Sequence, residues 1–232
     1  MIGAYLKSDY WAEVEQFDIE TGCKLRKIKI IKFPPDEMTD LVYEIIQLQR
    51  SVLDQTVYVA GVLSGLTGKD LECLNFPVST EAAFDSCVDG RCKGLHPELK
   101  ELFRSFQAHP AGNRSLFELN RIRRQGHHKF IEPVGTIADV EPGLASISDG
   151  YTGYIAAPVW DRKNHEIIFA SEGKDGKFGY DAKATFHIAF GEVDAVGGKP
   201  VLEFLNGTHA SVYEVLNSAI LCTNRLGLTN IP

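Results

Sequence analysis

The sequence predicts an α+β protein with an N-terminal hairpin, a helical middle, an antiparallel β-meander and a C-terminal helix. Three observations predict this order. Residues 10–33 alternate apolar and polar side chains, which is the period of a strand. Residues 36–131 carry apolar residues at helical spacing, and residues 133–205 are rich in strand formers and glycine. A last helix over about 209–226 completes a chain that we treat as a single domain, 1–232.

The hairpin and the first long helix have clear boundaries. "AEVEQFDIE" and "LRKIKIIKF" flank "TGCK", whose Thr-Gly suits a turn, and Pro34-Pro35 ends the second strand. A helix should follow, because acidic residues occupy its first turn, where the helix dipole favours them. The helix is also supported by apolar residues that recur at three- and four-residue spacing: Leu41, Ile45, Leu48, Val52 and Leu53.

Three shorter helices are expected next. "STEAAFDSCV" predicts a short helix with Ser79 as its N-cap, and "HPELKELFRSFQ" one with Pro97 in its first position. After the break at "HPAGN", a helix should begin at Ser115, because Ser115 and Glu118 match a capping box.

The strands are expected in "GYIAAPVW", "HEIIFASE", "ATFHIAFGEV" and "KPVLEFL", which glycine-rich turns separate. A second capping box, Ser211 with Glu214, predicts the start of the C-terminal helix. If the first hairpin joins the later sheet, the whole chain forms one domain.

Composition excludes several classes of function. The net charge of −7 argues against broad binding to DNA or anionic membranes, and no apolar run is long enough to span a bilayer. No signal peptide is visible, which predicts a cytoplasmic location. The five scattered cysteines are typical of reduced thiols, and Cys87 and Cys92 lack the second ligand pair that zinc needs. We therefore expect no metal and no cofactor.

One segment of this acidic chain is strongly basic: "NRIRRQGHHKF", residues 120–130. On a helix Arg121, Arg124 and His128 would form one stripe, bordered by Asn120, and Arg123 and His127 a second. These cations could simply stabilise a helix C-terminus. Alternatively, an arginine could hold a phosphate while a histidine transfers a proton.

A second polar pair, Arg50 and Asp54, interrupts the apolar first helix. It is either an intrahelical ion pair on the surface or a binding set in which Asp54 faces the basic segment. In the second case Asp54 would orient His128 or pair with Arg124.

These helices resemble a family of bacterial proteins without an established activity. Its members carry "LRSALDH", then "KGL.PE...L...F.P..GGN", then "ALN.L.N..KH"; the corresponding text here is "LQRSVLDQTVY", "CKGLHPELKELFRSFQAHPAGN" and "FELNRIRRQGHHKFIEPV". The matching residues are Arg50, Ser51, Leu53, Asp54, Asn120 and His128. Arg124 stands where the family has Asn, and Gln55 where it has His. The resemblance covers most of the chain and implies an architecture, not an activity.

The helices are also distantly similar to HEPN proteins, many of which are metal-independent ribonucleases of stress and defence systems. Their signature is Arg, four to six residues, then His. Arg123 to His128 fits this signature, as does Arg121 to either His127 or His128. HEPN proteins usually have a polar residue after the Arg, which favours the Arg123 frame, because Arg124 follows Arg123 and Ile122 follows Arg121.

Two hypotheses follow. In the first, the chain is a structural or non-catalytic binding protein, and the Arg50/Asp54 and Asn120/His128 sets lock two helices together. In the second, it is a HEPN-like ribonuclease or RNA-binding protein. Arg123 or Arg124 then holds the phosphate, His128 is the general acid or base, and Asn120 and Asp54 position them. RNA and a second copy of the chain are the partners expected under this second hypothesis.

Overall fold

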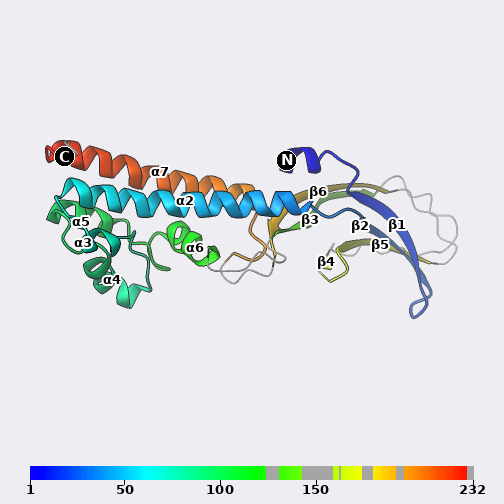
Figure 1. The fold of residues 1–232 in the computed structure, drawn as a ribbon. Helices are drawn as coiled ribbons and strands as arrows, with labels where there is room; N and C mark the ends of the chain where they lie inside the picture. The colour runs from blue at the N-terminus through cyan, green and yellow to red at the C-terminus, as the bar shows by residue number, and fades with distance from the viewer. Residues whose placement is uncertain (124–130, 143–158, 162, 174–179, 192–195, 229–232) are drawn as a thin grey trace. The chain divides into compact units, whose positions relative to one another are not determined.

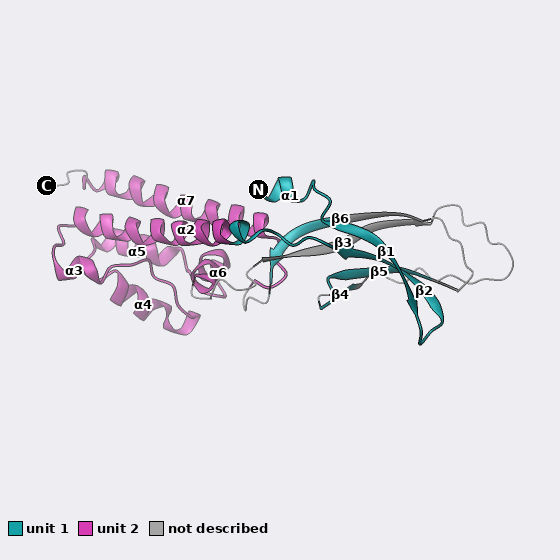
Figure 2. Cartoon of the chain, turned by 45° about the vertical axis from the view of Figure 1, so that its right-hand side comes forward, with its two compact units in different colours: residues 1–39, 129–191 teal, residues 40–128, 192–232 magenta. Residues whose placement is uncertain are grey.

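The computed structural model describes residues 1–123, 131–142, 159–161, 163–173, 180–191 and 196–228, and it confirms the α+β class and the order of elements (Figure 1). The chain forms two compact units (Figure 2). Unit 1 contains Met1–Thr39 and Lys129–Gly191, and unit 2 contains Asp40–His128 and Glu192–Pro232. The single domain predicted for residues 1–232 therefore contains two units, each built from two separate stretches of sequence.

Unit 1 holds the strands. A one-turn helix, α1 (Ile2–Tyr5), precedes the predicted hairpin of β1 (Trp11–Asp18) and β2 (Cys23–Ile30). The hairpin pairs with β5 (Glu166–Gly173), and β5 pairs with β4 (Val159–Asp161), which gives an antiparallel sheet in the order β1-β2-β5-β4. A second, two-stranded sheet consists of β3 (Ile131–Pro142) and β6 (Tyr180–Phe190). Both sheets thus join strands that lie far apart in the sequence.

The core of unit 1 comes from β2, β5 and β6. Its buried side chains include Ile28, Ile30, Ile167, Phe169, Phe186, Ile188 and Phe190. One buried ion pair lies beside them, with Lys27 Nζ 2.6 Å from Glu166 Oε1. Burying a charge is costly without a partner, so this pair helps to fix which residues of β2 and β5 face each other.

Unit 2 is helical. Its two long helices, α2 (Asp36–Leu63) and α7 (Val201–Arg225), lie side by side in both views (Figures 1 and 2). The shorter elements are α3 (Lys69–Glu72), the 3-10 turn η1 (Glu81–Ala83), α4 (Phe84–Arg91), α5 (Pro97–Ser105) and α6 (Arg114–Ile122). Both α5 and α6 contact α7, so the last helix of the chain closes the unit begun by α2.

Two predicted helix starts are wrong. Asn113, not Ser115, caps α6, and its side chain accepts a 3.1 Å hydrogen bond from the Leu116 amide. Asn and Ser are equally good N-caps, so the pattern alone could not separate them. In addition, the turn that leads into α4 begins at Glu81 after Thr80, and not with Ser79 as its cap.

The prediction for the C-terminal region is also partly wrong. Residues 199–205 were expected to form a strand, but α7 already begins at Val201. Ser211 lies inside this helix, where its hydroxyl donates to the Gly207 carbonyl, and it forms no capping box. Gly207 lies within the same helix, where a single glycine is tolerated.

The apolar residues that predicted α2 do not all face inwards. Leu53 is buried, but Leu41 and Leu48 are 41% and 65% exposed. The buried stripe instead includes Val42, Ile46 and Val57. This helix has apolar residues on two neighbouring faces, so periodicity alone did not show which of them faces inwards. Among the described residues, no helix is both long and apolar enough to cross a membrane.

Candidate functional site

Arg50 and Asp54, one turn apart on α2, together hold the backbone of Phe76. Asp54 Oδ1 accepts hydrogen bonds from Arg50 Nη2 (2.7 Å) and from the Phe76 amide (3.0 Å). Arg50 Nη2 also donates to the Phe76 carbonyl oxygen, at 2.9 Å. A backbone segment that is buried away from water must have its polar groups paired. The two side chains supply that pairing for both polar groups of Phe76.

The side chain of Phe76 is also anchored, because it is buried against other side chains of unit 2. Its side chain is 1% exposed, and its ring meets that of Phe103 in α5 edge to face, with centroids 6.1 Å apart. The Arg50 guanidinium lies 5.9 Å from the centroid of the same ring. The irregular segment between α3 and η1 is thereby anchored to α2 through one residue, by both its backbone and its ring.

The end of α6 reaches the same place on α2. Arg123 Nη1 lies 3.5 Å from Asp54 Oδ2. The carbonyl oxygen of Arg123 accepts hydrogen bonds from Gln47 Nε2 (3.3 Å) and from the Tyr43 hydroxyl (3.4 Å). The last carbonyls of a helix lack partners within it, so these two side chains satisfy one of them. We call the set of Arg50, Asp54, Phe76 and Arg123 the polar lock.

The predicted site residues are only partly brought together. Arg50, Asp54 and Arg123 meet in the polar lock. Asn120 is buried on α6, whereas Arg121 is exposed, with its guanidinium 6.0 Å from the Phe117 ring centroid. Arg121 and Arg123 therefore have different surroundings. Three further predicted residues lie outside the described part of the chain: Arg124, His127 and His128.

Sequence reasoning missed three members of this region. Tyr43 and Gln47 precede Arg50 and Asp54 at spacings of four, three and four, so all four residues share one helix face. That polar stripe was a detectable signal. The contribution of Phe76 was not detectable, because it consists of backbone groups that only the tertiary fold brings to α2.

A second charged cluster surrounds Glu118 on α6. Its side chain is 4% exposed; Lys199 Nζ lies 2.7 Å from Oε2, and Arg114 Nε lies 2.7 Å from Oε1. Lys199 lies two residues before α7 begins at Val201, so this pair joins α6 to the segment that leads into α7. A cavity of about 330 Å³ adjoins it, lined in part by Ser115 and Glu203. Both carboxylate oxygens of Glu118 therefore pair with cations, whereas the sequence had predicted that Glu118 forms a capping box with Ser115.

Within the described ranges, no group of three or more His, Cys, Asp or Glu side chains is placed to hold a metal ion. The cysteines in those ranges are free thiols.

Comparisons with protein-family models, curated proteins and solved structures give no match to this chain. The resemblance to the bacterial family and to HEPN proteins therefore stays a prediction from the motifs.

The polar lock can fix the relative positions of α2, the Phe76 segment and the end of α6. Asp54 is central to it, because this one carboxylate faces two guanidinium groups and one amide. Its two oxygens already have protein partners, as expected for a structural set and not for an open substrate site.

Proposed function

We propose that this chain is a non-catalytic binding protein in which the polar lock is structural. This proposal rests on one observation: the side chains of Asp54 and Arg50 are hydrogen-bonded to each other and to the buried backbone of Phe76. A group that binds substrate must exchange its partners for the substrate. Here that exchange would leave a buried amide and carbonyl without hydrogen bonds, which is costly.

The second candidate is a HEPN-like, metal-independent ribonuclease. One observation favours it: Asp54 lies 3.5 Å from the Arg123 guanidinium, whose side chain is 38% exposed. This hypothesis needs an acid that positions a solvent-accessible arginine of the basic segment. Arg123 would then hold the scissile phosphate, and His128 would act as general acid or base.

The experiment that separates the two is cleavage of a mixed RNA pool without metal by the wild type and by His128→Ala. His209→Ala, in the exposed part of α7, makes the same chemical change elsewhere and serves as the control. The binding-protein proposal expects no cleavage by any of the three proteins. Cleavage by the wild type and His209→Ala, lost in His128→Ala at unchanged melting temperature, would overturn it and favour the ribonuclease.

A further inference from the structure

A second apolar stripe runs along α2 and faces solvent. Leu41, Leu48 and Val59 are 41%, 65% and 45% exposed, and Ile45 and Val52 between them are half-buried. With Gln55, these positions follow each other at alternating spacings of four and three. That is the heptad spacing by which one helix packs along another. The stripe lies beside the buried face of α2 and roughly opposite Arg50 and Asp54 on the helical wheel.

The neighbouring helix α7 has a matching stripe. Tyr213 and Ile220, seven residues apart, are 62% and 47% exposed, and Leu216 between them is half-buried. Leu202, two heptads before Leu216, is 50% exposed. We call the stripes of α2 and α7 together the α2–α7 face.

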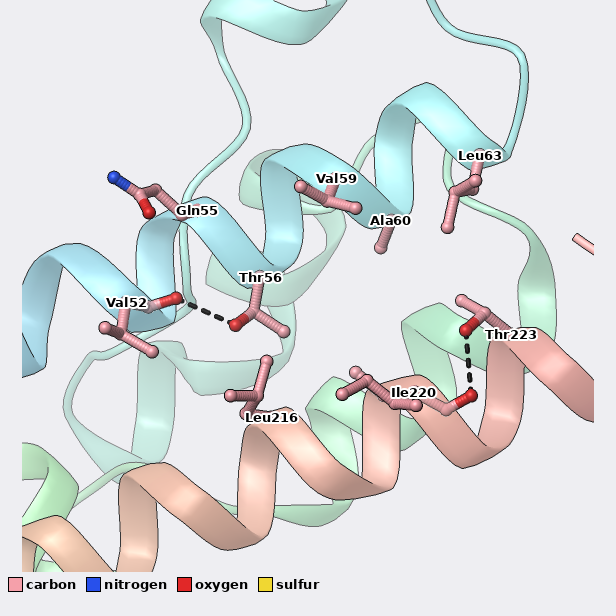
Figure 3. A pocket seen from close by; sticks show the side chains of 10 residues that line it. Val52, Gln55, Thr56, Val59, Ala60, Leu63, Leu216, Ile220 and Thr223 are labelled. Atoms are coloured by element: carbon pink, nitrogen blue, oxygen red, sulfur yellow. Dashed lines mark hydrogen bonds between the residues drawn. The ribbon is translucent and has the colours of Figure 1, made fainter. Parts of the chain in front are cut away.

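A groove of about 370 Å³ lies between these two helices (Figure 3). Val52, Val59 and Leu63 line it from α2, and Leu216 and Ile220 from α7. Its two threonines turn their hydroxyls to their own helices: Thr56 donates to the Val52 carbonyl (2.8 Å) and Thr223 to the Ile220 carbonyl (2.9 Å). The groove therefore offers mostly methyl groups and aliphatic side chains to whatever covers it.

The α2–α7 face is also uncharged along the groove. Between residues 45 and 63 the charged residues are Arg50 and Asp54, which point to Phe76, and residues 215–224 include none. Depletion of charge is typical of the core of a protein interface. A neutral surface does not favour a basic or an acidic partner. Two copies of it can come into contact without repulsion between like charges.

The dimensions suit a dimer. From Leu41 to Leu63 the helix is about 35 Å long, and two adjacent helices are roughly 20 Å wide. The resulting footprint of about 700 Å² is close to the ~800 Å² that each partner contributes to a standard interface.

We propose that the α2–α7 face binds a second copy of this chain in a two-fold arrangement, so that two helices from each copy pack together as four. The two-fold axis would pass near the groove between α2 and α7. This inference does not depend on the proposed function, because it uses the side of α2 opposite the polar lock. It also differs from a dimer formed through the basic segment of residues 120–130.

The test is sedimentation equilibrium of the full chain, with one variant and one matched control on each helix. Leu48→Glu and Ile220→Glu put a carboxylate on the α2–α7 face. Tyr58→Glu and Leu221→Glu make a similar change on other faces of the same helices, at residues that are 46% and 61% exposed. All four side chains are well exposed, so the variants should fold, and circular dichroism checks that they do.

We expect the wild type and both controls to sediment at twice the chain mass of 25.7 kDa. Each face variant should raise the dimer dissociation constant at least tenfold, because burying an unpaired carboxylate at an interface core is unfavourable. A wild type that stays monomeric at about 100 μM would overturn the proposal and leave the groove to an apolar ligand or another protein. A dimer that survives in both Leu48→Glu and Ile220→Glu would equally overturn it, since another surface would then form the contact.

Discussion

The hydroxyl of Thr208 in α7 lies 2.6 Å from the amide oxygen of Gln49 in α2, and both side chains are buried. The amide nitrogen of Gln49 donates to the Leu205 carbonyl oxygen at 3.2 Å. The two long helices of unit 2 are thus joined by hydrogen bonds inside an otherwise apolar contact. In such surroundings the pair specifies the register of α7 against α2, because a shifted helix would leave the Gln49 amide unpaired.

Thr208→Val should therefore lower the free energy of unfolding by about 1–3 kcal/mol, since it leaves the Gln49 oxygen buried without a donor. Adding Gln49→Leu to Thr208→Val should lower the free energy of unfolding by less than Gln49→Leu lowers it in the wild type, because it removes the Gln49 oxygen that Thr208→Val leaves unpaired. Urea unfolding of the two single variants and the double variant measures this coupling. Simple additivity of the two effects would contradict the role that we assign to this pair.

Two glycine substitutions, one in the loop before α6 and one inside α7, should change stability in opposite directions. A methyl group at Gly112 would overlap the carbonyl oxygen and Cβ of Gln107, and this carbonyl already accepts the Asn113 amide at 2.7 Å. Gly112→Ala should destabilise the protein by about 1–3 kcal/mol, because a backbone atom cannot move aside cheaply. Gly207 in α7 has open space around it, so Gly207→Ala should stabilise by about 0.5–1 kcal/mol through helix propensity. Thermal melting of the two variants compares the signs directly, and equal signs would refute this account of the loop.

Asp54 and Arg123 should differ in their importance for stability. Asp54→Ala removes the ion-pair partner of Arg50, whose side chain is 5% exposed, and the acceptor of the Phe76 amide. Losing one member of a buried ion pair costs ~3–5 kcal/mol, and because the Asp54 side chain is 28% exposed we expect roughly 2–3 kcal/mol. Arg123→Ala should cost about 0.5 kcal/mol, since its contact with Asp54 is longer and more exposed.

Glu44→Ala, at an exposed position of the same helix, is the control for Asp54→Ala and should change stability by less than about 0.5 kcal/mol. Denaturant titration of the three variants gives the ranking. If Arg123→Ala proved as destabilising as Asp54→Ala, the lock would depend on α6 and not on Phe76.

The cysteines allow a test that depends on pH. Burial raises the pKa of the Cys92 thiol from 9.0 to about 12, whereas Cys73 is exposed. At pH 8 a thiol reagent should modify Cys73 in the folded protein and Cys92 only after unfolding, because the thiolate is the reactive form and must be reached. Rapid labelling of Cys92 in the native state, located by mass spectrometry, would show that this part of unit 2 opens readily.

The same pKa shift predicts how stability changes in alkali. Between pH 9 and about 12 the unfolded chain loses the Cys92 proton while the folded chain keeps it. The stabilising contribution is therefore fully present below pH 9 and is lost as the pH rises towards 12. In Cys92→Ala the free energy of unfolding should fall less steeply over this interval than in the wild type. Other groups titrate there too, but they are common to both proteins.

Local patterns predicted most of the fold. The hairpin, the start of α2 after Pro34-Pro35 and the start of α5 at Pro97 all follow from turn residues and helix-start signals that act within a few positions. The failures concern choices that distant residues decide. Glu118 matched a capping box, yet it binds Lys199, 81 residues away. Val201–Leu205 looked like a strand, but these residues pack as the first turns of a helix that runs along α2.

The candidate site was predictable only in part. Arg50 and Asp54 stood out because charged residues are unusual in an apolar helix. The expected partners of Asp54 in the basic segment, Arg124 or His128, lie outside the described residues, and the structure pairs Asp54 with Arg123. The hydrogen bonds from Arg50 and Asp54 to the Phe76 backbone could not be predicted, because no sequence pattern shows where a backbone amide will need a partner.

The division of each unit into two stretches of sequence has a consequence during protein synthesis. Asp40–His128 leaves the ribosome before Lys129–Gly191, which completes unit 1, and only afterwards does α7 emerge to contact α2, α5 and α6. At ordinary rates of translation this delay lasts roughly 4–20 seconds. Throughout that interval the surfaces of α2, α5 and α6 that α7 later covers have no partner from their own chain. Nascent chains that stop before α7 should accordingly be held by chaperones, and chains that include it should be released.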